Sequence, residues 1–229
     1  MSGLSYKKLL LIGVSAALLL TGCNTSTSTE SSDDSGAIVA APTAGELNIS
    51  KMGGDIDVAD APGGAYLHTM GGGITVDKVQ KSLDASTMGG DVTINSASVG
   101  NLNVKTMGGS IDITSAQASD LHATTMGGNV TVQTTGDGSI YLKSMGGNIE
   151  LTIPKNSSAQ IDAQIEYNGY SGRNFTITDN LGLQQQQSSN WDLWHLSPRK
   201  HLYAKGTIGS GQNHIYVKTY GGNVILNAQ

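Results

Sequence analysis

The tetrapeptide Thr-Met-Gly-Gly, with small changes at its first position, recurs six times between residues 51 and 147 at a nearly constant interval. The intervals between its methionines are 18, 18, 19, 19 and 19 residues, and these methionines are Met52, Met70, Met88, Met107, Met126 and Met145. A seventh, altered copy, Thr219-Tyr220-Gly221-Gly222, follows 75 residues after the sixth. A fixed period of this length is typical of stacked repeat proteins.

Apolar residues alternate with polar ones on both sides of each copy. With the methionine numbered 0, positions −5, −3, +4 and +6 are apolar in all seven copies, which is the period of strands with one buried face. Positions −5 and −3 are out of phase with 0, +4 and +6, so a corner must separate two strands. The glycine pair, Gly53-Gly54 in the first copy and Gly221-Gly222 in the last, supplies it because glycine adopts positive φ and admits close backbone approach.

These features predict an all-β fold, a single parallel β-helix or solenoid of about seven rungs of 18–19 residues. Equal intervals place equivalent residues above one another at the strand spacing of ~4.8 Å, which favours this fold over a series of hairpins. Right-handed winding is expected from other parallel crossovers. An insertion at about 155–210 precedes the last rung. The methionines, and Tyr220 in the seventh copy, are expected to fill the inside of each corner as part of the core.

The N-terminus has the pattern of a secretion signal. Lys7 and Lys8 precede an apolar run over 9–20, which as a helix would span only ~18 Å of a ~30 Å membrane core. Leu20-Thr21-Gly22-Cys23 resembles the bacterial lipobox, so residues 1–22 are interpreted as a lipoprotein signal peptide and Cys23 as the lipidated N-terminus of the mature chain. An ordinary signal peptide with a cysteine nearby by chance is the alternative.

Residues 23–45, rich in Ser and Thr, bury too little apolar surface to fold and are expected to form a flexible tether. Residues 46–229 would then be the folded domain. The predicted location is the bacterial cell envelope, lipid-anchored. Residue 24 is asparagine, whereas an aspartate directly after the lipidated cysteine favours inner-membrane retention in enteric bacteria. In a Gram-negative cell the outer membrane is therefore favoured, on its periplasmic or surface face.

Charge argues against nucleic acid as a partner. Loss of Lys7 and Lys8 leaves 11 of the 13 basic residues against 18 acidic ones, a net charge of −7. From Lys155 onward, however, 6 basic residues face 4 acidic ones. Any surface that attracts anions is therefore expected in the C-terminal third.

The GGxIxV units, an Ile-Pro junction, an Ile-Asp-Ala-Gln-Ile strand and the closing segment from Gly206 to Val224 resemble the bacterial adhesin-like domain family. The resemblance covers about residues 45–229. It implies an all-β repeat domain of uncharacterised function, often found on envelope proteins and lipoproteins, and it supplies no catalytic or ligand-binding residues. The methionine at every corner and the Gln-rich, Trp-containing insertion depart from the usual pattern.

Three chemical interpretations of the repeats compete with a purely structural one. Thioether sulfur could bind copper(I) or a haem, although core packing explains six methionines more simply. Gly-Gly-Asp at Gly53 and Gly89 is similar to calcium-binding nonapeptide repeats, but position +3 is mostly Asp, Ser or Asn at twice that period and indicates a hydrogen-bonding column. Few acids lie in the outward columns, and His68 and His122 are ~14 Å apart, so catalysis is not expected. We expect no cofactor and no metal.

Aromatic and cationic residues gather toward the C-terminus. Position −4 holds His122, Tyr141 and Tyr216 in successive copies, and position −2 holds Thr124, Lys143 and Lys218. The insertion adds Trp191, Trp194, His195, Arg199 and Lys200. Such residues suit sugars, anionic polymers or a protein partner, whereas the tryptophans could equally cap the open end of the solenoid.

The sequence thus predicts a membrane-anchored, non-enzymatic envelope lipoprotein that serves as an adhesin-like binding or structural module. Its candidate partners are an envelope polysaccharide or a protein. Two alternatives remain: an enzyme acting on an envelope polysaccharide, and a stress-response lipoprotein that holds another protein.

Overall fold

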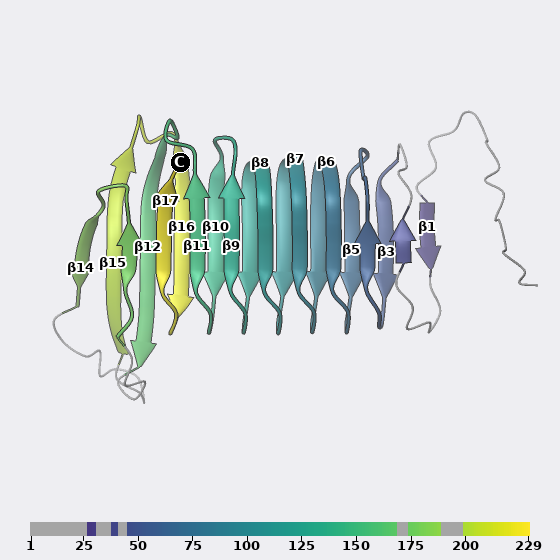
Figure 1. Ribbon diagram of the computed structural model, residues 1–229, viewed down its shortest axis with the longest axis horizontal. Helices are drawn as coiled ribbons and strands as arrows, with labels where there is room; N and C mark the ends of the chain where they lie inside the picture. Colours follow the sequence, from purple (N-terminus) through teal and green to yellow (C-terminus); the bar gives the residue numbers. More distant parts are fainter. Residues whose placement is uncertain (1–26, 31–37, 41–44, 169–173, 189–198) are drawn as a thin grey trace, which may run out of the picture.

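The computed structural model describes residues 27–30, 38–40, 45–168, 174–188 and 199–229. All regular elements in this part of the chain are strands. They are β1 (Thr27–Glu30), β2 (Ile38–Ala40), β3 (Leu47–Lys51), β4 (Ile56–Val58), β5 (Ala65–Thr69), β6 (Ile74–Thr87), β7 (Val92–Thr106), β8 (Ile111–Thr125), β9 (Val130–Thr134), β10 (Ser139–Ser144), β11 (Ile149–Ile153), β12 (Ala159–Asn168), β13 (Ile177–Asp179), β14 (Gln184–Gln187), β15 (Arg199–Ile208), β16 (Asn213–Tyr220) and β17 (Val224–Ala228). Figure 1 shows them stacked along one long axis.

The repeats form a parallel β-solenoid, which confirms the predicted fold class and excludes a series of hairpins. Equivalent residues pair from rung to rung, so that Leu83 lies between Ala65 and Leu102, with all these strands parallel. The same register continues through β8 and β10 to β16. Nearly equal repeat length is the cause. The one-residue difference between β6 and β7 is absorbed by a register shift between Lys81 and Ser82, so inward side chains stay inside on both sides of it.

The core is built from the four apolar columns that the alternation predicts. Every residue at positions −5, −3, +4 and +6 is buried in all seven copies. Isoleucine, leucine and valine dominate these columns, as expected for strands that pack face to face inside a closed rod. Each rung therefore stabilises the solenoid by packing its buried side chains against the equivalent side chains of the neighbouring rungs.

The methionines are not part of this core, so the prediction that they fill the inside of each corner was wrong. Their side chains are 42 to 73 % exposed. In one rung Thr106 is buried, Met107 and Gly108 are exposed, and Gly109 is buried again. Two consecutive outward residues turn the corner, and the change of phase falls between positions −1 and +2.

Threonine and the second glycine occupy the inside of the corner. The buried hydroxyl at position −1, a threonine or Ser144, donates to the second glycine's carbonyl oxygen in the preceding rung at 2.7 to 3.2 Å. In five rungs it also accepts a hydrogen bond from the second glycine's N–H of its own rung. The first copy has Lys51 here, and its ammonium group donates to the Asp55 carbonyl. These bonds satisfy backbone groups that the bend removes from the sheet.

The second glycine is required for space. A Cβ added to it would lie 2.0 to 2.2 Å from the carbonyl oxygen of the second glycine one rung below, in every copy from Gly72 to Gly222. Close backbone approach, one of the two reasons given for glycine, thus applies to the second glycine of each of these copies. Positive φ, the other reason, occurs at only two corner glycines, Gly54 and Gly221.

Position +3 is a hydrogen-bonding column, as the sequence indicates. Asp91 Oδ1 accepts from the Ser110 N–H at 2.6 Å, and Asn129 Oδ1 accepts from the Asn148 N–H at 2.8 Å. Asn148 and Asn223 continue the series, the latter to the Thr176 N–H. Each of these side chains thus closes a gap in the backbone ladder at the bend.

The insertion continues the sheet, and the seventh copy does not end the rod. Strand β16 lies between β10 and β12, parallel to both, and β17 lies likewise between β11 and β13. Beyond β12 the order is β15 and then β14, both antiparallel to their neighbours. The last residues of the chain are therefore inside the stack, and strands of the insertion form its end (Figure 1).

Part of the predicted tether is strand. Strand β1 pairs in parallel with β3, and β2 pairs with β4, so these segments add a partial rung at the N-terminal end. The remainder of residues 23–45, together with the signal peptide and Cys23, lies outside the described residues. Within the described part, no helix has the length and apolar character needed to cross a membrane.

Candidate binding face at the C-terminal end

Outward side chains of β10, β16, β12, β15 and β14 form one continuous surface, which we call the C-terminal face. These strands are neighbours in that order, and alternate residues of each point away from the core. Two rows cross it, the first being Tyr141, Tyr216, Asp162, Lys205 and Gln184, and the second Lys143, Lys218, Gln164, Tyr203 and Gln186.

Three rings stack at one side of this face. The His122 and Tyr141 ring centroids are 5.4 Å apart with an interplanar angle of 24°, and those of Tyr141 and Tyr216 are 5.2 Å apart with an angle of 15°. The rings stack because all three residues occupy position −4 of neighbouring rungs, so that their separation follows the spacing of the strands. Partial burial raises the pKa of the Tyr216 hydroxyl, so it remains a protonated donor at neutral pH.

A buried carboxylate organises the cations beside the rings. Glu166 accepts a hydrogen bond from Arg199 and lies 3.1 Å from the Lys218 ammonium nitrogen. Burial acts to raise the pKa of Glu166, but the hydrogen bonds and charges of Arg199 and Lys218 outweigh it, and the pKa lies below its ordinary value of 4.5. Lys218 also sits 4.6 Å from the Tyr220 ring centroid, and Lys143 lies 5.8 Å from the same centroid.

The pKa of Lys218 is raised. Burial acts to lower it, but the hydrogen bonds to Tyr220 and Glu166 prevail. Both charges of the pair are therefore present at neutral pH, and the position of Lys218 on the face is fixed by contacts with two strands, β12 and its own β16.

Two shallow hollows lie where β12, β15 and β14 meet. One, of about 370 Å³, is lined by Gln184, Gln186, Tyr203 and Lys205. The other, of about 410 Å³, shares Gln184 and Lys205 and extends over Asp162 to His214. Lys205 is fixed by an ion pair of 2.7 Å to Asp162 and lies 5.8 Å from the Tyr203 ring centroid. Amides, a phenol and a cation thus surround spaces large enough for a small ligand group.

Four of the candidate residues proposed from sequence, Tyr141, Tyr216, Lys143 and Lys218, do lie together. Arg199 joins them through Glu166. Lys200 pairs with Tyr167 and, by strand alternation, points to the opposite side of β15 from Tyr203, so it is not on this face. Trp191, Trp194 and His195 lie outside the described residues.

Sequence reasoning missed Tyr203, Lys205, the glutamines of β14, and Glu166. The insertion has no repeat to align it, and antiparallel pairing of β15 with β12 brings residues 43 apart in sequence into contact. The available signal was the alternation of polar and apolar residues at Tyr203, Ala204 and Lys205, which predicts that the tyrosine and the lysine point outward. Ala204 between them is fully buried.

The face offers binding chemistry rather than paired acid and base. Asp162 and Glu166 are four residues apart on one strand, about 13 Å, which is beyond the 5 to 9.5 Å between the carboxylates of glycoside hydrolases. Each is also in an ion pair. Among the described residues no group of three or more His, Cys, Asp or Glu side chains could hold a metal ion.

In a comparison with protein families, the family model of Toastrack DUF4097 covers residues 21–227. The chain belongs to the Toastrack DUF4097 family. This is an all-β repeat family of uncharacterised function. A search of curated proteins found no match to this Toastrack chain, and neither did a search of solved structures. Membership supports the fold and supplies no ligand.

Proposed function

We propose that this protein is a lipid-anchored, non-enzymatic binding module of the bacterial cell envelope, and that its C-terminal face holds a glycan chain. The observation that carries the proposal is the stack of His122, Tyr141 and Tyr216 beside rows of amides and cations. Aromatic rings accept the apolar C–H faces of sugars, and amides both donate to and accept from sugar hydroxyls.

The dimensions and charge of the face favour a polymer that carries negative charge. With β8, which carries His122, six neighbouring strands are involved, in the spatial order β8, β10, β16, β12, β15 and β14. They span about 24 Å at the strand spacing, enough for several sugar units in line. The face carries four cations against the carboxylates of Asp162 and Glu166, and these cations are Lys143, Arg199, Lys205 and Lys218. A net positive surface on a protein of net negative charge directs an anionic chain to this end.

Lipidation at Cys23 is the second part of the proposal. The Leu-Thr-Gly-Cys ending supports it, as does the apolar run that precedes it. Two or more acyl chains hold a protein stably on a membrane, which would leave the rod in the aqueous phase with its C-terminal face at the far end of the chain's axis.

Binding of the purified protein to insoluble cell-wall material and to a soluble acidic polysaccharide tests the glycan proposal. The double variant Tyr141→Ala with Tyr216→Ala is expected to bind at least about fivefold more weakly, since each lost stacking contact is worth about 0.5–1.5 kcal/mol. Tyr66→Ala is the matched control. Tyr66 occupies the same position −4, but its neighbours in register are Asn48 and Asp84 rather than rings.

Equal binding by the double variant and the parent would contradict the proposal. Release of soluble sugar fragments during the incubation would instead support an enzyme. The Tyr66→Ala control is expected to bind the cell-wall material and the soluble polysaccharide as tightly as the parent, because that rung lies near the other end of the rod (Figure 1).

A further inference from the structure

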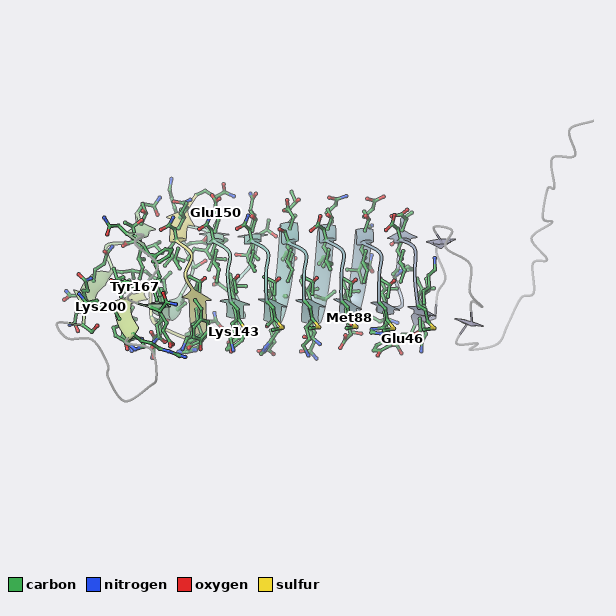
Figure 2. All side chains as sticks on the ribbon, turned by 90° about the horizontal axis from the view of Figure 1, so that it is seen from below. Glu46, Met88, Lys143, Glu150, Tyr167 and Lys200 are labelled. Carbon is green, nitrogen blue, oxygen red and sulfur yellow. The ribbon has the colours of Figure 1, made fainter. Side chains whose placement is uncertain are left out.

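The six corner methionines form a continuous exposed column, which we call the Met ladder (Met52, Met70, Met88, Met107, Met126 and Met145). The residues that precede them pair in strict register from rung to rung, from Lys51 and Thr69 to Thr125 and Ser144. Backbone bonds at the corner preserve that alignment, as in the Gly108 N–H to Met88 carbonyl bond of 3.0 Å. Figure 2 shows sulfur atoms recurring along the edge that carries Met88.

The fold does not require methionine at these positions. The side chains point outward, and Tyr220 occupies the same position in the seventh copy without disturbing the register of β16 on β10. Apart from Tyr66, the exposed large apolar side chains of the described residues are these six methionines. Core packing, the reason for preferring a structural role, therefore does not apply to the Met ladder.

We propose that the Met ladder binds a soft monovalent metal ion, copper(I) above all, between the sulfurs of neighbouring rungs. Thioethers are soft ligands that select Cu(I). Zinc–thiolate bonds in proteins are about 2.3 Å long, and copper(I)–thioether bonds of similar length would place two sulfurs on opposite sides of one ion about 4.6 Å apart. Adjacent rungs are separated by about 4.8 Å, and the three rotatable bonds of methionine allow the small adjustment.

Charge favours the N-terminal half of the Met ladder. Asp91 at position +3 follows Met88, whereas Lys105 and Lys143 at position −2 precede Met107 and Met145. At Met52 the carboxylate of Asp55 is offset by Lys51, whose ammonium group lies 3.3 Å from the Asp55 carbonyl oxygen. Carboxylates attract a cation and ammonium groups repel it. Met70 and Met88 are therefore the preferred ligands.

This site is separate from the C-terminal face. It uses the corner residues of the first six copies, and none of its sulfurs belongs to the glycan-binding rows. Metal binding and glycan binding can thus fail independently.

Competition for Cu(I) between the full chain and the chromophoric chelator bicinchoninate, under reducing, oxygen-free conditions, tests the proposal. All proteins carry Cys23→Ser so that no thiol contributes. One triple variant, Met70→Leu, Met107→Leu and Met145→Leu, removes every adjacent pair. The matched variant, Met107→Leu, Met126→Leu and Met145→Leu, removes the same number of sulfurs but leaves Met52, Met70 and Met88 adjacent.

The contiguous variant should retain the tightest Cu(I) affinity of the parent, and the alternating variant should be weaker by about tenfold or more, a loss of at least about 1.4 kcal/mol. Both should keep the parent's thermal midpoint, because leucine replaces methionine at an outward position. Equal affinities in the two variants, or no competition by the parent, would overturn the proposal.

Discussion

At the scale of the residue, one repeated corner assigns a different task to each of its four positions. Threonine closes hydrogen bonds inside, methionine and the first glycine face out, and the second glycine lets two rungs touch. The alternation in the sequence predicts that the phase changes here. It could not locate the change, because methionine is compatible with either side, and the burial of Thr106 had no apolar signature.

The two glycines of one corner should respond differently to the same substitution. A Cβ on Gly147 would lie 2.0 Å from the Gly128 carbonyl oxygen, whereas one on Gly146 meets nothing nearer than 3.6 Å. We expect Gly147→Ala to lower the free energy of unfolding by about 1–3 kcal/mol or more through overpacking. Gly146→Ala, measured by urea denaturation alongside it, should change it by less than about 1 kcal/mol. Comparable losses would show that the contact between rungs is not what requires glycine.

At the scale of the element, the end of the rod depends on β12. This strand pairs with β16 on one side and β15 on the other, and Glu166 connects the three through Lys218 and Arg199. The stacking of β16 on β10 follows from the repeat and could be predicted. The antiparallel addition of β15 and β14 could not, because their register is set by pairing with β12 and not by a period in the sequence.

Glu166 should make the stability of this end pH-dependent. Its pKa in the folded protein is depressed, so its contribution is fully present above the ordinary value of 4.5 and is lost as the pH falls through the folded pKa. Glu166→Gln should reduce the free energy of unfolding at pH 7 by about 1.5–3 kcal/mol and flatten its decline below pH 4.5.

Urea denaturation between pH 7 and pH 3 measures both effects. The exposed Glu150, which extends from β11 in Figure 2, provides the control Glu150→Gln. An acid decline of the same size in the parent and in Glu166→Gln would show that Glu166 is not its source.

At the scale of the whole molecule, a rigid rod is attached at one end to a segment that contains the single cysteine of the chain. The fold, its rungs and its core columns could be predicted because a constant period and strict alternation leave one arrangement of strands. The candidate site was predicted in its repeated half, at Tyr141, Lys143, Tyr216 and Lys218, and at Arg199 in the insertion. The remaining half depends on contacts distant in sequence.

Anchoring concerns the molecule as a unit and has a direct test. Expressed at full length in a bacterium, the parent should stay with the membrane fraction through salt washing and be released by detergent. Cys23→Ser should be recovered without detergent, because it lacks the thiol that we propose receives the diacylglyceryl group. Ser26→Ala, three residues further on, should behave as the parent. Release of the parent by salt alone would remove the anchor from the proposed function.

The position of β16 and β17 inside the stack has a consequence for the order of assembly. A chain synthesised from its N-terminus presents β12 to β15 before the strand that connects them to the rod exists. Until residues 213–228 emerge, the sixth rung is an open edge and the later strands have no platform, and such edges invite aggregation and proteolysis. Residues 213–228 therefore act as a latch, and the C-terminal end of the stack can form only once they have been synthesised.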